Sequence, residues 1–178
     1  ILQNFLNSKN NTCLIFEDDI KPNNSIHNMD IILKDIFSNI PINWDVLYLG
    51  RCLDSCTRDN PISNYLVENV NPNCTHAIAF TKKGVQKFHE NSGFIPKNKP
   101  IDWVIRDLIK SGKLNSYSVK PSLFQQNREN FSSEIDIETN PISDCSNFNI
   151  IYYIICPILI IIIILLILTK ISKFTKLI

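Results

Sequence analysis

The chain has 178 residues, of which 18 are Lys or Arg and 17 are Asp or Glu. This length fits one domain plus an appendage, because a single hydrophobic core usually takes about 100 to 200 residues. Lys170, Lys173 and Lys176 lie together near the C-terminus, so positions 1–149 hold 15 basic against 17 acidic residues. A domain with this balance has no basic face, which excludes a nucleic-acid-binding protein.

The first strand pattern ends in a run of acidic residues. The first residue is Ile1 rather than Met, and residues 1–5 (ILQNF) fit an apolar helix or strand rather than a leader sequence, so we expect the chain to begin inside a longer protein. Residues 12–16 (TCLIF) are a short apolar run followed directly by Glu17, Asp18 and Asp19. This pattern predicts a buried strand with carboxylates at its C-terminal end, where α/β sheets bind ligands.

Helix and strand patterns alternate in the middle of the chain. Residues 29–40 show largely helical spacing of isoleucines and are closed by Pro41, and residues 45–50 (DVLYLG) predict a second buried strand. Residues 65–70 form a weaker strand pattern, and residues 76–80 (HAIAF) form a stronger one.

Two helices and a strand follow. The first helix begins after Thr81, a suitable N-cap, and runs to about residue 89, before a cluster of Asn, Ser and Gly. The second helix covers residues 101–110 (IDWVIRDLIK) and stops at a nearby glycine. A last strand at residues 117–124 contains Pro121, which marks a sheet edge or a bend.

The alternation of strands and helices favours an α/β fold with a mostly parallel sheet flanked by helices. We assign residues 1–126 to this domain. Residues 127–149 are polar, irregular and acidic, and they predict a linker to the C-terminal part of the chain.

The C-terminal part predicts a membrane anchor. Residues 150–168 form an apolar run interrupted only by Cys156 and Pro157, and about 19 residues match a hydrocarbon core about 30 Å thick. We therefore expect one transmembrane helix at 150–169 and a basic cytosolic tail at 170–178. The positive-inside rule then places the domain in the lumen of the secretory pathway, or outside the cell; a tail-anchored cytosolic protein is the alternative.

Two further patterns bear on the compartment. Cys52 and Cys56 either close a short disulfide loop in an oxidising compartment or remain unpaired thiols. Four N-x-[ST] sequons agree with a lumenal domain. They begin at Asn10, Asn23, Asn73 and Asn130.

The acidic triplet has the chemistry of a cation site. In an extended chain Glu17 and Asp19 point the same way, while Asp18 points to the opposite side. Mn²⁺ or Mg²⁺ prefers such oxygen ligands and keeps positions open for diphosphate oxygens. The alternative interpretation is a solvated acidic turn.

Other residues also allow two interpretations. Asp102 opens a helix, so it either complements the helix dipole or acts as a general base toward an acceptor hydroxyl. His76 is either a metal or phosphate contact or a structural hydrogen-bonding residue. Trp44 and Trp103 are expected in the core, with stacking on a sugar ring as the alternative.

Five blocks occur in a recognisable order, and together they resemble glycosyltransferase family 25. This family contains bacterial lipooligosaccharide galactosyltransferases and animal procollagen galactosyltransferases. The blocks are LIFEDDI (14–20), WDVLYLGR (44–51), CTHAIAFTKKGVQKF (74–88), PIDWVIRDLI (100–109) and YSVKPSLFQQ (117–126).

The resemblance implies a GT-A type fold and an inverting transfer of a hexose, usually galactose, from a UDP-sugar to a hydroxyl of a glycan or protein. It implies that Glu17, Asp18 and Asp19 hold Mn²⁺ and the donor diphosphate; we add His76 to the cofactor-binding residues from its own position before a strand. Asp102 would be the base or an acceptor contact. The family's first strand and helix, which help to hold the nucleotide base, would lie before Ile1, so this fragment alone is expected to be inactive. The alternative is a non-catalytic, membrane-tethered binding or adhesion protein on the same fold.

Overall fold

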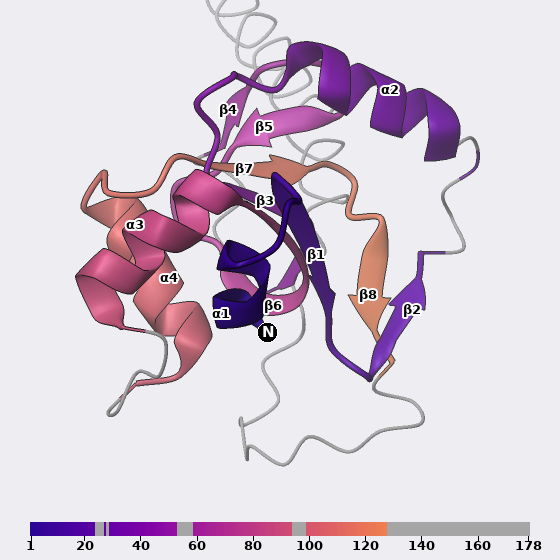
Figure 1. Cartoon of the computed structure of the whole chain (residues 1–178). Coiled ribbons are helices and arrows are strands. Elements are labelled where there is room, and N and C mark those ends of the chain that lie inside the picture. Colours follow the sequence, from indigo (N-terminus) through magenta and orange to yellow (C-terminus); the bar gives the residue numbers. More distant parts are fainter. Residues whose placement is uncertain (24–26, 28, 53–58, 94–98, 128–178) are drawn as a thin grey trace, which may run out of the picture. The chain divides into compact units, whose positions relative to one another are not determined.

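The structure is a computed structural model of the chain, and it describes residues 1–23, 27, 29–52, 59–93 and 99–127 (Figure 1). All of these residues belong to one unit, Ile1–Ser143. No helix in these ranges is long and apolar enough to cross a membrane. The predicted span at 150–169, the tail at 170–178 and nearly all of the predicted linker lie outside the described residues.

The described residues form helices and strands close to those predicted from the sequence. The helices are α1 (Leu2–Leu6), α2 (Met29–Asn39), α3 (Lys82–Ser92) and α4 (Ile101–Lys110). The strands are β1 (Thr12–Phe16), β2 (Ile20–Pro22), β3 (Val46–Cys52), β4 (Asn60–Pro61), β5 (Leu66–Glu68), β6 (Asn73–Thr81), β7 (Ser116–Val119) and β8 (Phe124–Gln126). The last predicted strand is divided at Pro121 into β7 and β8, as a proline there indicated.

The strand directions contradict the expected mostly parallel sheet. The main sheet has the order β1-β6-β3-β7-β5-β4, and only β3 and β7 pair in parallel. The cause is the connection between β3 and β6, whose sequence shows no helix pattern and therefore predicts no crossover helix. β6 begins at the same end of the sheet at which β3 ends, as the pairing of Cys52 with Asn73 shows. A return without a crossover makes β6 antiparallel to both neighbours.

Despite the inserted strand, β1, β3 and β7 all run in the same direction. Their C-terminal ends therefore lie at one end of the sheet, together with the N-terminal end of β6. A separate two-stranded sheet, formed by β2 and β8, follows directly from β1 and pairs Ile20 with Gln126. This arrangement brings the acidic triplet, the start of β6 and strand β8 together at one end of the main sheet.

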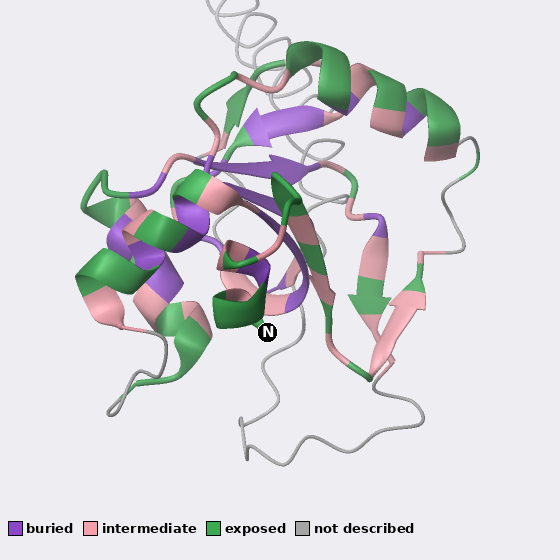
Figure 2. Cartoon of the chain, viewed as in Figure 1, coloured by how far each residue is buried: buried purple, intermediate pink, exposed green. Residues whose placement is uncertain are grey.

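The two faces of the main sheet each carry a hydrophobic cluster, and alternate residues of β3 and β6 belong to different clusters. One cluster joins Tyr48 and Phe80 to buried side chains of α1, α3 and α4. The other joins Leu47 and Ala79 to Ile32 and Ile36 of α2. Figure 2 shows the buried central strands between these helices. Coverage of both faces explains why residues 45–50 are continuously apolar after Asp45.

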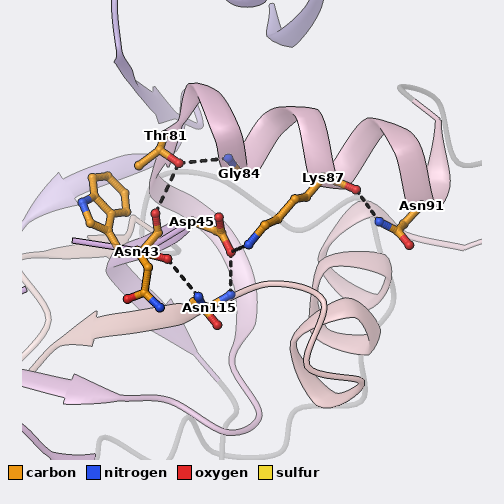
Figure 3. A network of polar contacts seen from close by, with 8 residues as sticks. Asn43, Asp45, Thr81, Gly84, Lys87, Asn91 and Asn115 are labelled. Atoms are coloured by element: carbon orange, nitrogen blue, oxygen red, sulfur yellow. Dashed lines mark hydrogen bonds and ion pairs between the residues drawn. The ribbon is translucent and has the colours of Figure 1, made fainter. Parts of the chain in front are cut away.

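A buried carboxylate connects three elements at the other end of the sheet (Figure 3). Asp45 is fully buried, and its Oδ2 accepts hydrogen bonds from Lys87 Nζ of α3 and from the backbone N–H of Asn115, 2.8 Å away. The Asp45 carbonyl accepts a bond from Thr81 N at 3.1 Å. A Cβ at Gly84 would lie 2.3 Å from that carbonyl oxygen, so only glycine allows α3 to pack this closely.

We expect Lys87→Met to lower the free energy of unfolding by about 2 to 3 kcal/mol, because the substitution leaves a buried carboxylate without its cation. Lys83→Met, on the exposed side of the same helix, is the matched control and should change stability by less than about 0.5 kcal/mol. Urea denaturation measures both values. Equal stability of the two variants would show that the pair does not hold α3 to the sheet.

Candidate functional site

The acidic triplet forms the connection between β1 and β2. Glu17 and Asp19 are half-buried, whereas Asp18 is exposed. The backbone N–H of Glu17 donates to the His76 carbonyl at 3.0 Å, which extends the pairing of β1 with β6 by one residue. The Asp19 carbonyl accepts from the N–H of Asn127 at 2.6 Å. Both ends of the triplet are therefore fixed by strand pairing.

The pKa of Glu17 shows the electrostatic character of the site. Burial is the main cause that raises the pKa of its carboxyl, and a hydrogen bond from Thr75 Oγ1, 2.9 Å from Glu17 Oε1, acts in the opposite direction. The charges of Asp19, Asp102 and Asp18 raise the pKa further, in that order. Four carboxylates from two distant parts of the sequence thus share one electrostatic neighbourhood. Such a neighbourhood favours a bound cation or a proton.

One carboxylate oxygen of Asp19 is hydrogen-bonded within the described structure, and the other is not. Its Oδ2 accepts from Gln126 Nε2 at 3.3 Å. Its Oδ1 is buried and has no hydrogen-bond partner among the described residues. Leaving a buried carboxylate oxygen unpaired costs free energy, so a cation or donor that reaches it gains binding energy there.

His76 lies beneath the triplet. The side chain is only 1 % exposed, and its Nε2 is 3.3 Å from the Phe124 carbonyl of β8. The ring packs against Gly50 of β3, where a Cβ would lie 2.4 Å from Nε2. The register of β3 against β6 shifts around Gly50, as in a β-bulge. This burial favours the structural interpretation of His76 over direct contact with a metal or phosphate.

Asp102 lies in the first turn of α4 and is half-buried. Its Oδ1 accepts from the N–H of Trp103 at 2.9 Å, so it does complement the start of the helix. Its charge also raises the pKa of Glu17, so the two carboxylates interact electrostatically. Its contact with the start of the helix is therefore compatible with a role as a general base.

A disulfide joins the ends of β3 and β6 beside the site. It pairs Cys52 with Cys74, with a Cα–Cα distance of 5.6 Å. Both interpretations of Cys52 from the sequence, a short Cys52–Cys56 loop and an unpaired thiol, are therefore wrong, because β-sheet register places Cys52 opposite the start of β6. Cys56 lies outside the described residues. A disulfide is typical of proteins in oxidising compartments.

The described residues contain no group of three His, Cys, Asp or Glu side chains arranged to hold a metal ion by themselves. A Mn²⁺ or Mg²⁺ ion that accompanies a nucleotide needs only one or two carboxylates, since phosphates and waters complete its coordination. Glu17 and Asp19 supply hard oxygen ligands of this kind, and the buried Oδ1 of Asp19 has no other partner in the described structure. The two residues fit a cation that is shared with a diphosphate.

No family model and no curated protein matches the chain. The family resemblance therefore depends on the five blocks and on the site that they form. Sequence reasoning missed Thr75 and Gln126 as hydrogen-bond partners of Glu17 and Asp19, and it missed Gly50 as the residue against which His76 packs. Only Gly50 gave a signal, as a glycine at the end of a buried strand.

We expect a non-reducing digest of the oxidised protein to contain a peptide that links Cys52 to Cys74. Replacing both with Ser should lower the free energy of unfolding by about 3 kcal/mol, because the cross-link closes a loop with a sequence separation of 22 residues. Mass spectrometry and urea denaturation make the two measurements. A Cys52–Cys56 peptide as the main product would contradict the pairing.

Proposed function

We propose that this chain forms the metal and acceptor side of an inverting hexosyltransferase. The enzyme transfers a hexose, expected to be galactose, from a UDP-sugar to a hydroxyl of a glycan or protein acceptor. The observation that carries the proposal is the buried Oδ1 of Asp19, which has no hydrogen-bond partner among the described residues and follows Glu17 after the C-terminal end of β1. The GT-A type fold belongs to the same proposal.

The concentration of negative charge supports a cation-dependent reaction. Burial raises the pKa of Glu17 most, and the negative charges of Asp19, Asp102 and Asp18 raise it further. A diphosphate would not bind here without a positive ion, because like charges repel. A cation on Glu17 and Asp19 would neutralise the charge that develops on the departing UDP.

Asp102 supplies the acceptor side of the proposed reaction. In one displacement step, the acceptor oxygen forms a bond to the anomeric carbon while the bond from that carbon to UDP breaks on the opposite face. The acceptor proton moves to the Asp102 carboxylate, which the N–H of Trp103 orients. Attack from the opposite face inverts the anomeric configuration.

The alternative is a non-catalytic, membrane-tethered binding or adhesion protein on the same fold. One observation favours it. β1 forms an edge of the described sheet, and Leu14 and Phe16 on it are 58 % and 44 % exposed. No described strand pairs with the outer edge of β1, and this exposed apolar edge is available to a binding partner.

The proposed location is a single-pass membrane protein with this domain in the secretory lumen and the tail at 170–178 in the cytosol. The Cys52–Cys74 disulfide supports an oxidising compartment. The sequon at Asn10 is exposed, whereas Asn73 bonds to Arg106 and is a poorer site for a glycan. The tail-anchored cytosolic alternative would instead keep these cysteines as thiols.

We expect the full-length protein to release UDP from UDP-galactose or UDP-glucose in the presence of Mn²⁺ and an acceptor. Asp19→Asn should lower this activity by about 100-fold or more, because it removes the charge of a proposed metal ligand while keeping the side-chain shape. Asp30→Asn, which changes an exposed acid on α2, is the control. Equal turnover by the Asp19 variant and the wild type would reject the metal-site assignment.

The pH dependence of Mn²⁺ activation should follow the raised pKa of Glu17. A proton and the cation compete for this carboxylate, so activation should fall as the pH drops through the raised pKa, at higher pH than for an ordinary glutamate. In Glu17→Gln, which cannot ionise, this part of the pH profile should disappear together with most of the activation. Unchanged profiles would exclude Glu17 as a ligand.

A further inference from the structure

Trp103 lies in the first turn of α4, and it is 49 % exposed. The expectation that it belongs to the core is therefore wrong, whereas Trp44 does pack against the cluster under α2. A single exposed indole is common on protein surfaces, so its neighbours decide what it can bind. Trp103 directly follows Asp102, the acceptor-side residue of the proposed reaction.

The indole ring of Trp103 is held in place by a neighbour on the same helix. The guanidinium carbon of Arg106 lies 5.1 Å from the centroid of the indole ring, a cation–π distance. Arg106 Nη1 also donates to Asn73 Oδ1 at 2.8 Å, at the start of β6. One side of the ring is thus tied to the sheet beside the Cys52–Cys74 disulfide. A ring fixed in this way loses little conformational entropy when a ligand binds to its exposed part.

The position of the ring relative to the triplet separates two ligands that stack on indoles. α4 packs against β6, and β6 is the strand that pairs with β1 in the sheet. Asp102, the base of the proposed reaction, lies next to Trp103 on α4, so the acceptor is expected here rather than the nucleotide. A sugar of the acceptor is the ligand that would lie on the α4 side. A pyranose presents an apolar face of C–H groups to an aromatic ring and hydroxyls at its rim, which suits an indole beside a carboxylate.

We propose that Trp103 and Asp102 form a subsite for a hexose ring of the acceptor, with the sugar stacked on the indole and its hydroxyls bonded to the carboxylate. This inference rests on the proposed transferase for its place in the reaction. It narrows the acceptor from a glycan or protein to a glycan that presents a hexose.

The test uses the full-length protein in detergent, with methyl β-galactopyranoside and methyl β-glucopyranoside as probes. The chain has two tryptophans, so a Trp44→Phe background makes the fluorescence report on Trp103 alone. We expect a saturable change in emission with at least one glycoside. Galactitol, an open-chain polyol without a ring face, should produce no such change.

Two variants at position 103 test the stacking. Ligand-observed NMR should show that Trp103→Ala weakens glycoside binding by about fivefold or more, while Trp103→Phe, which keeps an aromatic face, stays within about threefold. The side chain is half exposed, and thermal melts check that both variants remain folded. Equal binding by Trp103→Ala and wild type, equal binding of galactitol, or no saturable binding of either glycoside would overturn the proposal.

Mn²⁺-dependent UDP binding by the wild type, measured on the same sample, separates this inference from the proposed function. Glycoside binding without UDP binding would reject the transferase and keep the sugar subsite. UDP turnover together with Trp103-independent glycoside binding would reject the subsite and keep the transferase.

Discussion

The arrangement of the sheet depends on the hydrogen bonds of the buried Asp45 carboxylate. It receives a charged hydrogen bond from Lys87 of α3 and a backbone bond from Asn115, which leads into β7. The start of β3 is thereby fixed against both elements. A buried charge needs such partners, because desolvation would otherwise outweigh the attraction. From this fixed end, β3 extends to Gly50 and Cys52 at the candidate site.

The opposite end of the same strands is irregular. The register of β3 shifts around Gly50, and Cys74 has a positive φ of 62°, which is unusual for a residue other than glycine. The disulfide and the packing of His76 against Gly50 hold this irregular segment in place. Bulges and unusual backbone angles often occur where side chains are aimed at a ligand. Here they lie next to Glu17, whose side chain accepts a bond from Thr75.

Local sequence signals predicted local structure well. The helix at Ile101–Lys110 was predicted with its correct bounds because its apolar residues repeat with helical spacing, and Thr81 caps α3 by accepting from Gly84 N at 2.9 Å. The short strands β2 and β4 were missed because two or three residues carry no periodicity.

Long-range features were not readable from local patterns. The direction of β6 depends on how the chain returns after β3, and the Cys52–Cys74 pairing follows from that register. The proximity of Asp102 to Glu17 could be expected only from the family resemblance, since the two residues lie on distant elements. The half-exposed position of Trp103 was not predicted, because its spacing in α4 does not distinguish the core from the helix edge.

The central claim is that Glu17 and Asp19 share a cation with a nucleotide diphosphate. Electron paramagnetic resonance of Mn²⁺ tests it directly, because the signal of the free hexaaquo ion falls when the ion binds to a protein. We predict that the full-length wild type removes this signal more strongly with UDP than either the protein or UDP does alone. The double variant Glu17→Gln, Asp19→Asn should show no more loss of signal than UDP alone. The same loss of signal in wild type and double variant would contradict the account.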